Sequence, residues 1–255
     1  MMVGPLLLGM PKSLPQKPKK QRPSAASWLS RSIARLLGKA DKSAPKPKAV
    51  RPHGNVRPLA PTKAETALLE PFAGLPPDCI HVPKTKAECR AAAEEIFEAG
   101  IAGFDTEARP TFRAGEKSSG PHVVQFALTD KAFIFQLHRH DCQKAAADLI
   151  ASDRVLKVGF GLKNDHGQIR SRLGVKLHAV VDLDHIFRKR GYQHQMGVRA
   201  AMGTVLNLSF PKSKSITTSN WAAAELTPRQ LRYAANDAFA ALKIMEALDL
   251  KPGEM

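Results

Sequence analysis

The distribution of charge along the chain sets the first limit on its fold. Residues 1–65 contain 14 lysines and arginines against two acidic residues, and they hold 10 of the 19 prolines in the 255-residue chain. Because like charges repel and proline lacks a backbone donor, such a segment cannot bury enough apolar surface to offset the entropy lost on ordering. The sequence therefore predicts a disordered basic arm over residues 1–65 and a folded domain over residues 66–255.

The arm has two functional interpretations. It carries a net charge of +12 out of +16 for the whole chain, which favours electrostatic attraction to phosphate backbones. The alternative is a solvated linker. One stretch differs, because Trp28, Leu29, Ile33, Leu36 and Leu37 fall at helical spacing. This spacing is typical of a short amphipathic helix that docks on a partner, a membrane surface or nucleic acid, or of a nascent helix that is mostly unfolded alone. At about 12 residues the nascent helix is the favoured interpretation.

Cysteine usage and hydropathy indicate the compartment. The three cysteines are odd in number and show no C-x-x-C spacing, which favours free thiols in a reducing environment over a disulfide framework or a thiolate zinc site. No run approaches the roughly 20 apolar residues that span a bilayer, and no secretory signal is recognisable. The expected location is intracellular: the cytoplasm of a bacterium, or the nucleus or an organelle of a eukaryote, with no membrane partner.

Apolar periodicity in residues 66–255 alternates between the spacing of strands and that of helices. Early strands form a hairpin and later strands alternate with helices, which predicts an α/β fold with a mixed sheet of five to six strands flanked by helices. Thr227 followed by Pro228 is a favourable helix start. The predicted strands are 79–82, 101–106, 122–128, 132–137, 155–160 and 179–183, and the predicted helices are 84–99, 142–151, 164–173, 197–206 and 227–248.

Four acidic residues are candidates for a ligand site: three follow the carboxyl ends of predicted strands, where open α/β folds bind ligands, and one lies on a late helix. Asp105 and Glu107 follow a buried strand and point to one face, because side chains alternate along a strand. Asp165 also lies beyond a strand end. Asp237 shares a helix face with Tyr233, four residues earlier. Taken singly, these patterns are typical of a solvated turn, a helix-start acid and a partly exposed acid beside a packed tyrosine.

Together they predict a site for two divalent cations, Mg²⁺ or Mn²⁺, that cleaves phosphodiesters. Hard cations prefer carboxylate oxygens, and paired ions stabilise both the attacking and the leaving oxygen. Asp105 is suited to bridge both ions, Glu107 and Asp237 to hold the ion beside the attacking water, and Asp165 to hold the other. Tyr233 is predicted to orient that water or to help deprotonate it.

Three ordered motifs resemble the DEDD superfamily of 3′–5′ exonucleases, in its tyrosine subtype. They read GFDTEA at 103–108, VGFGLKND at 158–165 and YAANDAFAALKI at 233–244. KSITTSNW at 214–221 and LTPRQLRYAANDA at 226–238 resemble the Werner-type exonuclease domains more narrowly. Gly161 follows that group, in which glycine replaces the asparagine of polymerase proofreading domains. The similarity covers about residues 70–250.

The resemblance implies a ribonuclease-H-like fold, two Mg²⁺ or Mn²⁺ ions and stepwise release of nucleoside 5′-monophosphates from a 3′ end. DNA is the expected partner. One alternative is ribonuclease D-like trimming of RNA, although those enzymes usually carry a further helical domain and this chain ends 18 residues after Asp237. Another is an inactive nucleic-acid-binding module. DNA repair is expected from the resemblance only. Candidate substrate contacts are Thr106, Gly161, Asn164 and Trp221, with core packing the favoured interpretation for Trp221.

Overall fold

The computed structural model describes residues 58–111, 115–116, 118–248 and 250. These residues belong to one compact unit. Most of the expected basic arm, including its amphipathic stretch, lies outside the described residues. Within the described part of the chain, no helix is long and apolar enough to cross a membrane.

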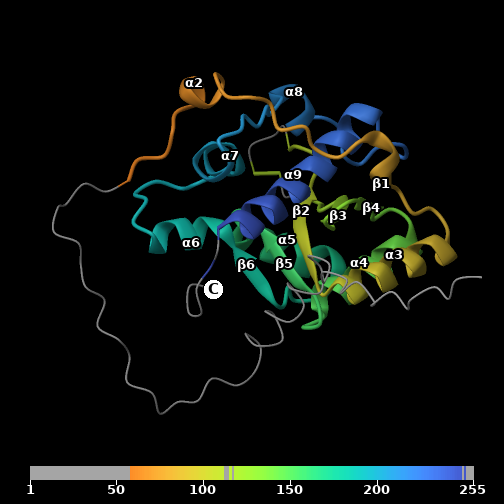
Figure 1. Cartoon of the computed structure of the whole chain (residues 1–255). Coiled ribbons are helices and arrows are strands. Elements are labelled where there is room, and N and C mark those ends of the chain that lie inside the picture. Colours follow the sequence, from red (N-terminus) through yellow and green to blue (C-terminus); the bar gives the residue numbers. More distant parts are fainter. Residues whose placement is uncertain (1–57, 112–114, 117, 249, 251–255) are drawn as a thin grey trace, which may run out of the picture. The chain divides into compact units, whose positions relative to one another are not determined.

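A six-stranded mixed sheet forms the centre of this unit (Figure 1). The strand order is β1-β4-β3-β2-β5-β6, in which the β2–β3 and β3–β4 pairs are antiparallel and the β1–β4, β2–β5 and β5–β6 pairs are parallel. The predicted mixed sheet of five to six strands is therefore confirmed. The strands are β1 Ile80–His81, β2 Ile101–Glu107, β3 Val123–Ala127, β4 Ala132–Gln136, β5 Leu156–Gly159 and β6 Val180–Asp182.

Helices cover both faces of the sheet. On one face α3 and α4 pack over the phenylalanines of β2, β3 and β4, and on the other α9 packs along β2, β3, β4 and β5. The helices are α2 Lys63–Thr66, α3 Lys86–Ala99, α4 His140–Ala151, α5 Asp165–Leu173, α6 Leu183–Lys189, α7 Val198–Leu206, α8 Lys214–Thr217 and α9 Pro228–Ala247, with short 3₁₀ turns η1 Pro77–Cys79 and η2 Leu162–Asn164.

The closest approach between sheet and helix occurs where β2 passes under α9. A Cβ atom added to Gly103 would lie 1.9 Å from the backbone oxygen of Ala238. Only glycine fits at such a distance, so Gly103 allows the α9 backbone to rest directly on β2. Two residues further along β2 is Asp105, and one residue before Ala238 is Asp237. The same contact therefore brings two of the predicted site residues to one place.

Two local features of the structure are absent from the sequence prediction, each for an identifiable reason. The disordered arm was expected to extend to residue 65, but α2 begins at Lys63, and its cap residue Thr62 forms reciprocal hydrogen bonds with Glu65. This T-x-x-E capping box is a helix signal that the proline-rich composition masks. The short helix α6 was not predicted either, because the strand β6 ends at Asp182 and that residue immediately caps α6 by accepting from Asp184 N–H.

All three cysteines are described and free. Cys89 of α3 and Cys142 of α4 are buried together, with their sulfur atoms 3.1 Å apart. Burial raises the pKa of Cys142 to about 12, so this thiol stays protonated at neutral pH. The pair contributes to the core as small apolar side chains.

Candidate active site

The first motif lies on β2, whose last three residues reach the edge of the core. Asp105 pairs with Gln125 across the β2–β3 ladder, and Glu107 pairs with Val123. Val123 belongs to the hydrophobic cluster under α9, whereas Phe104 belongs to the cluster under α3 and α4. Because residues opposite one another in a ladder share a face, both carboxylates point to the α9 side.

The third motif meets the first on that side. Asp237 projects from α9, and one carboxylate oxygen from each of Asp105, Glu107 and Asp237 lies within 4.8 Å of the other two. Asp237 is the most buried, with 4% of its side chain exposed. We call these three residues the acidic trio. The sequence prediction that two distant motifs supply carboxylates to one cluster is consistent with this geometry.

The second motif places Asp165 beside the trio but not within it. The chain leaves β5 at Gly159, turns through η2, and begins α5 at Asp165. The Thr106 hydroxyl donates to Asp165 Oδ1 at 2.8 Å. Thr106 is predicted to contact substrate, and in this structure its hydroxyl holds the Asp165 carboxylate. A side chain between two trio members thus fixes the position of the fourth acid.

Negative charge on the acidic trio is electrostatically unfavourable unless positive charge lies nearby. Burial and the Asp237 carboxylate raise the pKa of Asp105 to about 8, and burial and Asp105 raise the pKa of Glu107 to about 9. Burial also raises the pKa values of Asp165 and Asp237. Carboxyl groups in such surroundings become favourable as anions only when cations are close. Closely spaced carboxylate oxygens are suitable ligands for a hard divalent ion, so the residues present fit such a metal.

Among the described residues, Lys212 forms an ion pair with the trio, and no sequence pattern predicts it. Lys212 lies between α7 and α8, and its Nζ is 2.9 Å from Asp237 Oδ2. Burial lowers the pKa of Lys212, but the Asp237 and Asp105 carboxylates outweigh this and raise it above its ordinary value. Nothing in the sequence distinguishes Lys212 from the exposed Lys214 two residues later.

Tyr233 stands one helical turn before Asp237. Its hydroxyl is 2.8 Å from the Thr217 hydroxyl of α8, and its ring lies 6.0 Å from that of Trp221. Burial raises the pKa of Tyr233 to about 12. The phenol therefore remains protonated near neutral pH, which favours orientation of a water molecule over its deprotonation.

Gln125, on the strand beside Asp105, was not anticipated. Its side chain is fully buried, and neither amide atom has a hydrogen-bond partner among the described residues. Burying an amide without a hydrogen-bond partner costs free energy, so Gln125 places a second unsatisfied polar group next to Asp105. A glutamine inside an apolar strand is the signal that could have identified it.

The other three residues predicted to contact substrate are Trp221, in the core, and Gly161 and Asn164, which line one cavity. Trp221 is 1% exposed and donates through Nε1 to Thr217 O, so it is a core residue whose ring cannot stack on a base. Gly161 adopts a φ of 68° and donates its N–H to Asp182, which gives it a structural role in the turn after β5. Gly161 and the exposed Asn164 also line a cavity of about 360 Å³ with Lys163 and Arg188.

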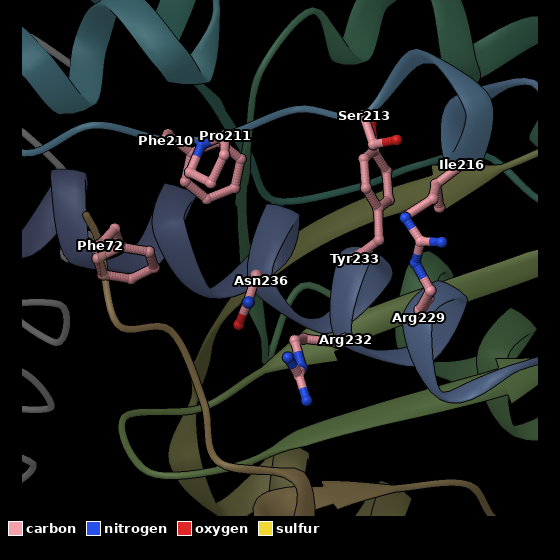
Figure 2. A pocket seen from close by; sticks show the side chains of 9 residues that line it. All are labelled: Phe72, Phe210, Pro211, Ser213, Ile216, Arg229, Arg232, Tyr233 and Asn236. Atoms are coloured by element: carbon pink, nitrogen blue, oxygen red, sulfur yellow. The ribbon is translucent and has the colours of Figure 1, made fainter. Parts of the chain in front are cut away.

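Two cavities flank the trio. The trio cavity, of about 230 Å³, is lined by Asp105, Asp237 and Lys212, together with Phe160 and residues 195–198. The tyrosine cavity, of about 240 Å³, lies along α9 (Figure 2). Figure 2 shows Tyr233 and Arg229 at one end of it and the rings of Phe72 and Phe210 at the other, with Arg232 and Asn236 along the helix.

Comparison with known proteins places this arrangement in a family. A family model described as a 3′–5′ exonuclease matches residues 80–251. The bifunctional 3′–5′ exonuclease/ATP-dependent helicase WRN of Mus musculus is 26% identical over 169 residues, which are 64% of this chain and 12% of that protein. The chain therefore spans a small part of the length of this curated relative.

Solved structures share the fold. The Nibbler EXO domain of Aedes aegypti aligns with a TM-score of 0.59 and 23% identity, covering 71% of this chain and 94% of that one. RNase D of Trypanosoma brucei, in complex with RNA U12, aligns with a TM-score of 0.59 and 21% identity, covering 68% and 63%. The family match covers residues 80–251, and the mixed sheet and the acidic trio are consistent with it. The chain therefore belongs to the 3′–5′ exonuclease family of the DEDD superfamily.

Proposed function

We propose that this protein is a metal-dependent exonuclease that removes nucleotides one at a time from the 3′ end of DNA. The observation that carries the proposal is the acidic trio, in which three carboxylate oxygens lie within 4.8 Å of one another. The raised pKa values of Asp105 and Glu107 support the proposal, because cations beside this cluster would favour its anionic form, and a metal-dependent phosphodiester hydrolase uses cations at such a place.

The residues present would hold two divalent ions, Mg²⁺ or Mn²⁺. The Asp105 carboxyl is affected electrostatically by both Asp237 and Asp165, so it would serve both ions, with Glu107 and Asp237 holding one and Asp165 the other. When bound, such ions polarise the phosphate and stabilise charge on the attacking and leaving oxygens. The Thr106–Asp165 hydrogen bond of 2.8 Å holds the outer acid in position before any ion arrives.

The protein's own side chains then handle water and substrate. Tyr233 orients the attacking water through its hydroxyl, which Thr217 holds at 2.8 Å. Water adds to phosphorus as the bond to the 3′-oxygen of the preceding nucleotide breaks. The shortened strand keeps a 3′-hydroxyl, and the released product is a nucleoside 5′-monophosphate. Arg229 and Arg232, exposed on α9 beside the tyrosine cavity, are positioned to contact backbone phosphates (Figure 2).

RNA is the second candidate substrate. The fold similarity to an RNase D that was solved with RNA favours it, whereas the similarity to a WRN exonuclease and the SNW segment at 219–221 favour DNA. An inactive binding module is the third possibility. All five motif residues are present, which weighs against it.

A labelled-end degradation assay tests the proposal. Single-stranded DNA, a recessed duplex and RNA of the same sequence, each labelled at the 5′ end, are incubated with Mg²⁺, Mn²⁺ or EDTA. We expect a ladder that shortens from the 3′ end in either metal, and no ladder in EDTA or with Asp237→Asn. Faster loss of RNA than of DNA would reverse the substrate assignment. Binding without any shortening would replace it with the inactive module.

A further inference from the structure

The ion pair between Lys212 and Asp237 occupies the position where the proposed metal site needs a free carboxylate. It is the only ion pair that the acidic trio makes within the described part of the chain, and its Nζ–Oδ2 distance is 2.9 Å. The two side chains are unequally buried: 4% of Asp237 is exposed against 32% of Lys212. The carboxylate is fixed in the core, whereas the lysine reaches it from a surface segment.

An ammonium and a divalent ion are poor neighbours at one carboxylate. A hard cation such as Mg²⁺ sits about 2.0–2.1 Å from its oxygen ligands. A lysine within hydrogen-bond distance of the same carboxylate would repel it with twice the force between two unit charges. Either cation neutralises the Asp237 carboxylate, so binding of one weakens the attraction of that carboxylate for the other.

The structure gives Lys212 somewhere to go. It lines the trio cavity with Asp105 and Asp237, and its side chain is 32% exposed, so solvent lies within its reach. It also lines a cavity of about 280 Å³ with Lys63 and Arg199, whose positive charges would direct a freed ammonium toward solvent. While it pairs with Asp237, its Nζ also lies 5.6 Å from the centre of the Tyr233 ring, whose face is attractive to a cation. Because Lys212 lies on a connecting segment and its side chain is partly exposed, its ammonium can turn from the carboxylate toward solvent.

We propose that Lys212 is an internal counter-cation, which neutralises Asp237 in the metal-free protein and is displaced when a divalent ion binds. The inference rests on the proposed metal site. In the metal-free state the ammonium of Lys212 reduces the repulsion among the three carboxylates of the trio. In the metal-bound state the released ammonium lies at the mouth of the site, where it adds positive charge for an incoming phosphate.

Manganese titration of the full-length protein, without nucleic acid, tests the exchange. Lys212→Met removes the competing ammonium, so we expect the dissociation constant for Mn²⁺, measured by calorimetry, to fall about five-fold. Lys131→Met is the matched control: Lys131 pairs with Glu95 at 2.9 Å, its side chain is 30% exposed, and the pair is remote from the trio. The control variant should bind Mn²⁺ as the wild type does.

Thermal unfolding and chemical labelling give independent readouts. In EDTA, Lys212→Met should unfold at a lower temperature than the wild type, and saturating Mn²⁺ should remove this difference. Lys131→Met should show the same difference in both conditions. In the wild type, Mn²⁺ should increase the acetylation of Lys212 by acetic anhydride, measured by mass spectrometry, because the freed ammonium becomes accessible.

The outcomes separate this inference from the proposed function. Unchanged or weaker Mn²⁺ binding by folded Lys212→Met, or a stability loss equal in EDTA and Mn²⁺, would overturn the exchange and leave the nuclease intact. If Lys212→Met does not fold, acetylation of the wild type decides, and labelling that Mn²⁺ leaves unchanged or reduces would overturn the exchange. A wild-type protein that binds no Mn²⁺ would overturn both.

Discussion

Asp105→Asn should stabilise the metal-free protein while it abolishes cleavage. Asparagine has nearly the shape of aspartate but carries no charge, so it removes the repulsion within the acidic trio. Burial and the Asp237 carboxylate raise the pKa of Asp105 to about 8. In the unfolded chain an aspartate has a pKa of about 3.9 and is ionised at pH 7, so folding at pH 7 must add a proton to Asp105. The cost of this protonation is set by the difference between pH 7 and the unfolded pKa, about three units.

The size of the effect follows from this difference. Each unit corresponds to about 1.4 kcal/mol, which gives an upper limit of about 4 kcal/mol at pH 7. Because Asp105 is half-buried and solvent screens part of the repulsion, we expect about 2 kcal/mol. The sign reverses with metal: an ion at 100 times its dissociation constant stabilises the wild type by about 2.7 kcal/mol, and the variant loses most of this.

Urea unfolding in EDTA and in saturating Mn²⁺ measures both signs. Asp105→Asn should have the higher midpoint in EDTA and the lower midpoint in Mn²⁺, with unchanged slopes. Asp148→Asn on α4, remote from the trio, is the control and should show neither effect. A variant that is less stable than the wild type in EDTA would refute the reasoning, because it would show that the carboxylate is favourable in the empty site.

Four further outcomes are expected. Tyr233→Phe, which loses the hydroxyl bonded to Thr217, should lower kcat about 100-fold with little change in KM. The metal-free protein should lose stability as the pH rises from about 4 to 9, because the raised pKa values of Asp105 and Glu107 favour the protonated folded state; Mn²⁺ should flatten this profile in calorimetric scans. Gly103→Ala should cost about 3 kcal/mol or more in urea unfolding, given a Cβ only 1.9 Å from Ala238 O. Deleting residues 1–57, with their many lysines and arginines, should leave kcat unchanged and flatten the salt dependence of DNA binding.

The sequence was informative where one pattern extended over many residues. The apolar run that ends at Asp105 and Glu107 predicted both the strand and the common face of the two acids, and β2 Ile101–Glu107 confirms the strand. The helix expected over 227–248 is α9 Pro228–Ala247, capped by Thr227 as the Thr-Pro start indicated. Long periodic segments carry such information because burial on one face constrains every turn.

The sequence was uninformative where a contact depends on tertiary packing. Lys212 enters the trio only because the α7–α8 segment passes above Asp237, and no local pattern encodes that path. Gln125 faces Asp105 through the β2–β3 register, which a sequence specifies only jointly. Trp221 lies near the third motif, which suggests base stacking, but its ring is 1% exposed and packs in the core, as the favoured interpretation of the sequence predicts.

The products released from a 3′-labelled strand test the central claim most directly. An oligonucleotide whose terminal phosphodiester is radiolabelled is incubated with the protein over a range of Mn²⁺ concentrations, and the products are separated by chromatography. The proposed function predicts a nucleoside 5′-monophosphate as the first labelled product, formed only with metal and not by Asp105→Asn. Release that persists in EDTA or with Asp105→Asn, or a first product longer than one nucleotide, would contradict it.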